Sequence, residues 1–181
     1  MNKTFEYIKQ WLIADKIEDF DENIQGYCRF RDLFNVRADR FLIEVKKPIL
    51  AAVAGEIGSN SFDHNFAKWK DIVGIIFKYD INQRVIVIAD RGQGLKTTLS
   101  NVRVGIENDI DAVKIAFKEV LSGRAPERRG NGLKFVFNTI ITNNWKLYFQ
   151  SGNGVLEISE GKAIFSENQE NIKGCLAIIN Y

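Results

Sequence analysis

The fold of this chain is decided first by one short stretch, Glu56-Ile57-Gly58-Ser59-Asn60-Ser61-Phe62-Asp63-His64. Pro48 suits the first turn of a helix, and the stripe Ile49, Val53, Ile57 and Phe62 continues it. Residues four apart share a helix face, so Glu56 and Asn60 lie side by side. An Asn amide oxygen is a hard ligand of the kind that Mg²⁺ accepts, and a Glu one turn away can polarise a water or a hydroxyl. Asp63 and His64 extend the same helix toward the same site. The alternative is an amphipathic helix with a solvated polar face.

A second stretch, Asp90-Arg91-Gly92-Gln93-Gly94, follows the apolar run from Arg84 to Ala89. The run predicts a strand, so the carboxylate of Asp90 is expected where the strand ends. A buried carboxylate there can accept a hydrogen bond from an exocyclic amine such as that of adenine. Gly92 and Gly94 let the backbone turn and approach a flat base. The alternative is an exposed turn after a strand.

A third stretch, Arg129-Gly130-Asn131-Gly132-Leu133, precedes another helical stripe. Free N–H groups at a helix N-terminus, reached without a Cβ, favour a phosphate. Arg124, Arg128 and Arg129 can pair with phosphate oxygens, although a solvated basic loop is the favoured interpretation for at least two of the three. Residues 95 to 129, between the two glycine pairs, have the composition of a segment that closes over a bound nucleotide, or of an ordinary helical insertion.

The remaining pattern predicts an α+β protein. The first 47 residues are read as a helical extension, with Tyr27, Phe30 and Phe34 on one helix face. A hairpin is expected over 71–89, helices over about 110–121 and 133–144, and four short strands between 145 and 179, separated by turns such as Ser151 to Gly154. This order predicts a single domain over 1–181, a two-layer sandwich with one mixed sheet and its helices on one face.

Composition restricts the classes of function. The chain has 181 residues and a formal net charge of +2, which gives no general attraction for nucleic acid or an anionic membrane. No apolar run is long enough to span a bilayer, and no signal peptide is recognisable. Cys28 and Cys175 form no metal-ligand pattern. We therefore expect a cytoplasmic protein with reduced thiols and with neither nucleic acid nor membrane as a partner.

The three stretches in this order resemble the boxes of the ATP-binding superfamily shared by gyrase, Hsp90, histidine kinases and MutL, the GHKL superfamily. Glu56 and Asn60 match its N box, Asp90 to Gly94 its first glycine box, and Gly130 to Leu133 its second. The resemblance covers about residues 48 to 180. It implies a Bergerat-type fold with a mobile ATP lid over 95–129.

The resemblance also implies roles for these residues. Asn60 would bind Mg²⁺, Asp90 would recognise adenine, and Gly130 and Gly132 would face the phosphates. Glu56 stands where the catalytic base of the superfamily stands. The remaining residues expected to contact the nucleotide are Asp63, His64, Gly92, Gly94, Arg129, Asn131 and Leu133.

Within the superfamily, the small size and His64 after Asn60 are similar to anti-sigma-factor serine kinases, which phosphorylate a small antagonist protein of the STAS type. The expected function is a Mg²⁺-dependent ATPase or serine/threonine kinase that acts on a partner protein in bacterial signalling, with a homodimer as one possible assembly. The expected lid over residues 95–129 is longer than the lid of that group. Asp63 also differs from the residues that many of its members carry at this position.

Two other functions remain open from the sequence. ATP can order a segment and so create or hide a protein-binding surface, without useful turnover. A catalytic domain of histidine-kinase type is the other; because His64 is the single histidine and lies inside the N box, it would need a separate protein as phosphoryl acceptor. A domain with coincidental glycine turns is the plain alternative to all of these.

Overall fold

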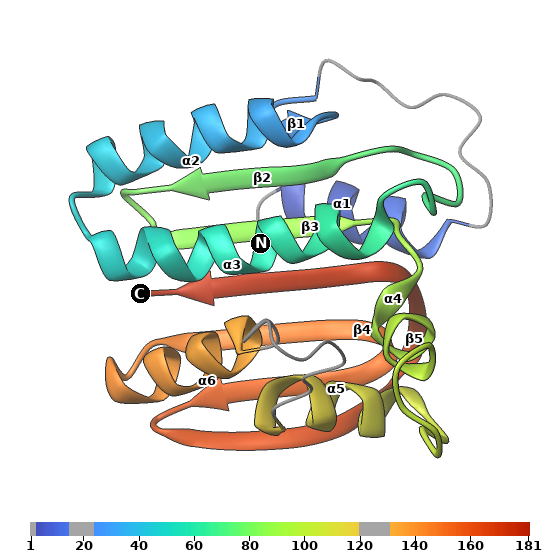
Figure 1. The fold of residues 1–181 in the computed structure, drawn as a ribbon. Helices are drawn as coiled ribbons and strands as arrows, with labels where there is room; N and C mark the ends of the chain where they lie inside the picture. The colour runs from blue at the N-terminus through green and yellow to red at the C-terminus, as the bar shows by residue number, and fades with distance from the viewer. Residues whose placement is uncertain (1–2, 15–23, 120–130) are drawn as a thin grey trace, which may run out of the picture.

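A computed structural model describes residues 3–14, 24–119 and 131–181. Figure 1 shows one sheet with helices packed across it. Along the described chain the elements are α1 (Lys3–Ile13), β1 (Tyr27–Cys28), α2 (Arg31–Val45), α3 (Pro48–Asn65), β2 (Ile75–Asp80), β3 (Val85–Asp90), α4 (Gly94–Ser100), α5 (Asp109–Lys118), α6 (Gly132–Thr142), β4 (Lys146–Ser159) and β5 (Lys162–Asn180). None of the helices described is long and apolar enough to cross a bilayer.

The sheet has five strands in the order β1-β2-β3-β5-β4, which confirms the α+β class. Every pairing between its neighbouring strands is antiparallel, so the expectation of a mixed sheet was wrong. The reason lies in the connections. Short turns join β2 to β3 and β4 to β5, and strands joined in this way must run in opposite directions.

Both faces of the sheet are covered. Helices α2 to α6 supply side chains to the main core on one face, as expected, including Phe34, Leu50, Leu95, Phe117 and Val136. The opposite face, which the sequence interpretation left bare, is covered by α1 (Figure 1).

The contact of α1 with the sheet follows from residue spacing on both elements. Ile8, Trp11 and Leu12 form an apolar stripe on α1 and pack on the rear face of the sheet. Successive side chains of a strand point to opposite faces. Val85, Val87 and Ala89 of β3 therefore face α1, while Ile86 and Ile88 face the main core.

Helix α3 lies at the centre of the main core, where Val53, Ile57 and Phe62 of the predicted stripe are buried. Ile49 was wrongly placed in that stripe: it is exposed, and Leu50 is buried instead. Gly58 is required there by packing, since a Cβ would lie 2.3 Å from the ring of Phe34. Tyr27, which was expected on a helix, instead pairs with Ile76 in β1. The N-terminal 47 residues thus contribute an edge strand as well as helices.

The C-terminal region forms two long strands where four short ones were expected. Residues 151–154, read as a turn, are an irregularity inside β4. Gly152 and Gly154 make room there for the start of α5, because a Cβ on either would lie within 2.4 Å of Asp109. The carboxylate of Asp109 accepts a hydrogen bond from the Asn153 amide at 3.1 Å. The actual turn, at Glu160 and Gly161, has positive φ at both residues, as a two-residue hairpin loop needs.

The segment between the glycine pairs is in large part helical. Ala112, Val113 and Phe117 of α5 are buried in the main core, and Phe117 packs edge-on against Phe149. Residues 120–129 of the expected lid lie outside the described residues.

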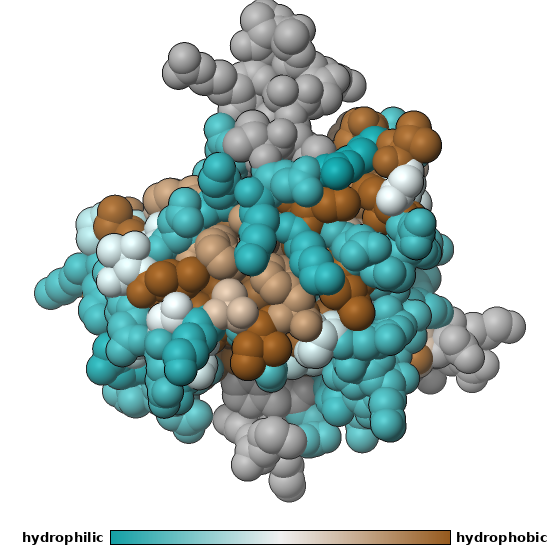
Figure 2. Space-filling view, turned by 90° about the horizontal axis from the view of Figure 1, so that it is seen from below, coloured by the Kyte–Doolittle hydropathy of each residue, from teal (hydrophilic) through white to brown (hydrophobic). Residues whose placement is uncertain are grey.

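Figure 2 shows the face that lies below the view of Figure 1, where hydrophobic area is framed by hydrophilic side chains.

Candidate functional site

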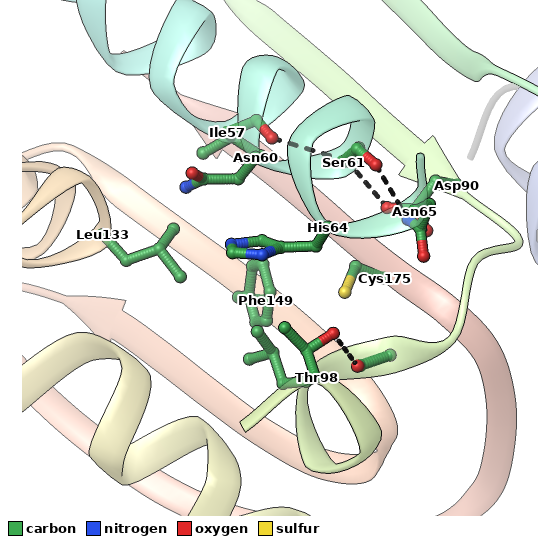
Figure 3. A pocket seen from close by; sticks show the side chains of 12 residues that line it. Ile57, Asn60, Ser61, His64, Asn65, Asp90, Thr98, Leu133, Phe149 and Cys175 are labelled. Carbon is green, nitrogen blue, oxygen red and sulfur yellow. Dashed lines mark hydrogen bonds between the residues drawn. The ribbon is translucent and has the colours of Figure 1, made fainter. Parts of the chain in front are cut away.

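A pocket opens between α3, the end of β3, the start of α4 and the start of α6 (Figure 3). His64, Leu133 and Phe149 point into it from three different elements. The residues that line it are Ile57, Asn60, Ser61, His64, Asn65, Asp90, Gly94, Leu95, Thr98, Leu133, Phe149 and Cys175. Five residues singled out from the sequence therefore meet here, namely Asn60, His64, Asp90, Gly94 and Leu133.

Asp90 forms the polar floor of this pocket and is only 2% exposed. Its Oδ2 accepts a hydrogen bond from Ser61 Oγ at 2.7 Å, and its Oδ1 accepts one from the Gly92 amide at 2.8 Å. Burial raises the pKa of Asp90, and these donors work against the rise. Asn65 Nδ2 lies 3.4 Å from Oδ1, and the backbone N–H of Cys175 is a further donor, so protein groups already use much of the acceptor capacity of this carboxylate.

The loop after β3 is held by the end of α3. Asn65 Oδ1 accepts a hydrogen bond from the Gln93 amide at 2.8 Å, and Gln93 Nε2 donates to the His64 carbonyl at 2.7 Å. Gly92 is needed for close approach, because a Cβ would lie 2.1 Å from the Asn65 amide nitrogen. Gly94 has a φ of 76°, which is the left-handed conformation expected of it.

The paired residues of the first stretch face the third. A Cβ on Gly132 would lie 2.3 Å from Glu56 Oε2 and 3.6 Å from Asn60 Nδ2. Glu56 is exposed and Asn60 is partly buried, so both are open to a ligand. Gly132 begins α6, where unpaired backbone N–H groups create a positive potential. A carboxylate, an amide and a helix N-terminus thus converge beside the pocket.

Other residues expected at the site lie elsewhere. Asp63 is exposed and forms an ion pair with Arg31 of α2 at 2.5 Å, and it does not line the pocket. The arginine at the start of α2 attracts it to that side of α3. Arg129 and Gly130 lie outside the described residues. Asn131 precedes α6 and is exposed.

Two titratable side chains on the pocket wall are neutral at pH 7. His64 is exposed to solvent by its surface area, yet protein atoms on one side of the ring lower its pKa by desolvation, against the effect of neighbouring Asp63. Burial, and next the charge of Asp90, raise the pKa of the Cys175 thiol well above its usual value. Cys175 is therefore an unreactive part of the wall, because the thiolate is the reactive form.

The fold is similar to that of a gyrase B ATPase domain. The solved structure is the 43K ATPase domain of Thermus thermophilus gyrase B in complex with an aminocoumarin, with 17% sequence identity and a TM-score of 0.43. The match covers 71% of this chain and 32% of the gyrase chain, so this chain matches about a third of that protein's length. No protein-family model and no curated protein matches the sequence.

Several residues of the site were not found from the sequence. Ser61 and Asn65 are one turn apart on α3, and Ser61 directly follows Asn60, so their spacing was an available signal. Cys175 and Phe149 come from β5 and β4, far away in sequence. Their arrival at the pocket depends on strand order, which no local pattern encodes. Ser151 is a similar case, since its Oγ accepts the Leu95 amide at 2.9 Å and fixes the start of α4.

The donors present suit Mg²⁺ better than a transition metal. The described residues contain no cluster of three or more histidine, cysteine, aspartate or glutamate side chains. The side-chain atoms that face Gly132 are Glu56 Oε2 and Asn60 Nδ2, and both side chains also carry an oxygen that can bind a cation. A site with one or two protein oxygens fits an ion that keeps water and phosphate oxygens in its shell.

Proposed function

We propose that this chain binds ATP with Mg²⁺ and transfers or hydrolyses its terminal phosphoryl group. The observation that carries the proposal is the position of Asp90, a buried carboxylate at the floor of a pocket with apolar walls. An exocyclic amine, such as that of adenine, is the donor that it fits. The apolar walls supplied by Ile57, Leu133 and Phe149 suit a flat base.

The arrangement of Glu56, Asn60 and Gly132 supports a position for the phosphates beside the start of α6. With the base against Asp90, the phosphates would extend toward Gly132 and the N-terminus of α6. The absence of a side chain at Gly132 lets the Glu56 carboxylate approach this helix start closely, since a Cβ would lie 2.3 Å from Glu56 Oε2. Bound Mg²⁺ would supply charge neutralisation on the phosphate oxygens, with Asn60 as its protein ligand.

Glu56 is the residue for proton transfer. In this role its carboxylate accepts the proton of an attacking hydroxyl or water while that oxygen forms a bond to the terminal phosphorus. The bond to the bridging oxygen breaks, and ADP leaves with the electron pair. We propose as acceptor a serine or threonine of a partner protein in a bacterial signalling circuit, with the STAS-type antagonist as the first candidate and water as the alternative.

Glu56→Gln separates binding from chemistry. We expect ADP affinity within about threefold of the wild type and phosphate release from Mg·ATP slower by about a hundredfold or more, the contribution typical of a general base. Asp63→Asn is the matched control, since it changes an acid on the same helix that lies outside the pocket. It should leave phosphate release unchanged. Equal turnover by Glu56→Gln and wild type would contradict the role of Glu56. Tight binding with no turnover in either would favour an ATP-gated binding module.

A further inference from the structure

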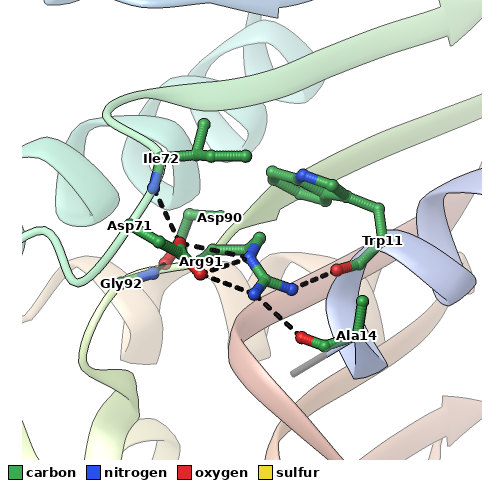
Figure 4. Close-up of polar contacts among 7 residues, drawn as sticks. All are labelled: Trp11, Ala14, Asp71, Ile72, Asp90, Arg91 and Gly92. Carbon is green, nitrogen blue, oxygen red and sulfur yellow. Dashed lines mark hydrogen bonds and ion pairs between the residues drawn. The ribbon is translucent and has the colours of Figure 1, made fainter. Parts of the chain in front are cut away.

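Arg91, which no step of the proposed function uses, is a fully buried charged side chain on the rear side of the sheet. Its guanidinium faces Asp71, with Nη2 2.5 Å from Oδ2 and Nε 3.2 Å from Oδ1 (Figure 4). Nη2 also donates to the carbonyl of Ala14 at 2.9 Å, and Nη1 donates to the carbonyl of Trp11. One side chain thus joins the loop after β3 to the end of α1 and to the segment before β2.

Arg91 donates hydrogen bonds to backbone carbonyls at the C-terminal end of α1. The last carbonyls of a helix have no partner within it, and Trp11 and Ala14 lie at the C-terminal end of α1. A cation at this end also interacts favourably with the helix dipole. The carbonyls remain beneath Arg91 only while Ile8, Trp11 and Leu12 hold α1 on the sheet.

Arg91 is also one residue away from the floor of the pocket. Asp90 faces the pocket and Arg91 faces α1, because successive residues of a strand point to opposite sides. Gly92 returns to the pocket side, where its amide donates to Asp90 Oδ1 at 2.8 Å. The orientation of the 90–92 backbone is therefore fixed on one side by the base-binding carboxylate and on the other by α1.

We infer that Arg91 is a positioning residue that couples the docking of α1 to nucleotide binding. This inference rests on the proposed function for its ligand. Docked α1 holds Arg91, Arg91 holds the 90–92 backbone, and that backbone sets the Asp90 carboxylate for the base. By thermodynamic reciprocity, nucleotide binding strengthens the docking of α1 by the same factor. Release of α1 by a partner protein would weaken nucleotide binding without any contact in the pocket.

Leu12→Ala tests the coupling, with Val85→Ala as its matched control. Both remove apolar volume from the same rear cluster, but Val85 begins β3 and pairs with Asp80 and Asn180, at the far end of the strand from Asp90. We expect Leu12→Ala to weaken ADP binding in calorimetry by about fivefold or more. Val85→Ala should change it by less than twofold. Arg91→Lys, which keeps the charge but loses the planar set of donors, should also weaken it. Equal ADP affinity of Leu12→Ala and Val85→Ala, with both folded, would overturn the inference.

Amide hydrogen exchange makes the inference testable apart from the proposed function. Without ligand, Leu12→Ala should speed exchange at the Gly92 and Gln93 amides, whereas Val85→Ala should not. In the wild type, ADP should slow exchange in α1. If the wild type does not bind ADP, the proposed function fails, and the exchange at Gly92 and Gln93 alone decides whether α1 positions the loop. Unchanged exchange at these amides in Leu12→Ala would refute the positioning.

Discussion

Ser61→Ala removes the hydrogen bond that reaches Asp90 from α3, and its effect should depend on pH. Ser61 Oγ lies 2.7 Å from Asp90 Oδ2, and both residues are buried. A hydrogen bond to a charged group contributes about 1.5–3 kcal/mol, and one between neutral groups about 0.5–1.5 kcal/mol. We therefore expect a loss of about 2 kcal/mol in the free energy of unfolding at a pH where Asp90 is ionised and about 1 kcal/mol at a pH where it is protonated.

The sign follows from the pKa of Asp90, which burial raises above that of the unfolded chain. Its contribution to stability is fully present below the unfolded pKa of about 4 and is lost as pH rises through the folded pKa. Loss of the Ser61 donor raises the folded pKa further and so increases the loss at high pH. The difference between wild type and variant should grow from pH 4 to pH 8.

Urea unfolding at several pH values measures this difference. Ser59→Ala is the control, because it makes the same change on the same helix at a residue that does not line the pocket. It should cost less than about 0.5 kcal/mol, with no trend in pH. A cost for Ser61→Ala that stays constant between pH 4 and pH 8 would refute the idea that Asp90 ionises against burial with the help of Ser61.

Three further predictions concern single residues. Gly174→Ala should cost more than about 3 kcal/mol in urea unfolding, since its φ is 70° and a Cβ would lie 2.0 Å from a backbone oxygen at the end of β3, whereas Gly161→Ala, with the same φ and open space, should cost about 1 kcal/mol. Gly132→Ala should leave stability unchanged or raise it by up to about 1 kcal/mol, because Ala suits a helix better, yet it should weaken ATP binding at least tenfold in calorimetry. Burial works to raise the pKa of Asp71, but hydrogen bonds from Arg91 and the Ile72 amide, together with the positive charges of Arg91 and Lys173, outweigh it. The pKa is therefore lowered, so the stabilisation is present above about pH 4 and is lost as pH falls. Asp71→Asn should cost about 3 kcal/mol at pH 7 and progressively less below pH 4, and a cost independent of pH would contradict the ion pair.

The local part of this structure was predictable from the sequence because it depends on near neighbours in the chain. Apolar residues three and four apart placed a helix after Pro48, and they put Glu56 and Asn60 on one face of it. The apolar run from Arg84 to Ala89 gave β3 with Asp90 at its end. The close approach of backbone at Gly92 and the positive φ of Gly94 agree with the choice of glycine at both.

The remaining features depend on contacts between distant segments. The expectation of a turn at 151–154 failed because the glycines there accommodate Asp109 of α5 rather than a chain reversal. The apolar residues of α1 pack on the rear face of the sheet, but their spacing in the sequence does not specify the surface on which they pack. Asn65 holds Gln93 across 28 positions of sequence, and no spacing rule predicts such a pair.

Calorimetric titration of ATP, with and without Mg²⁺, into wild type and Asp90→Asn tests the central claim most directly. Ser61 and the Gly92 amide both donate hydrogen bonds to the Asp90 carboxylate. In Asp90→Asn, one carboxylate oxygen is replaced by an NH₂ group, which is a donor and cannot accept these bonds. We predict Mg²⁺-dependent binding by the wild type and at least tenfold weaker binding by Asp90→Asn, with both folded. No binding by the wild type, or equal binding by both proteins, would contradict the assignment of Asp90 as the group that recognises the base.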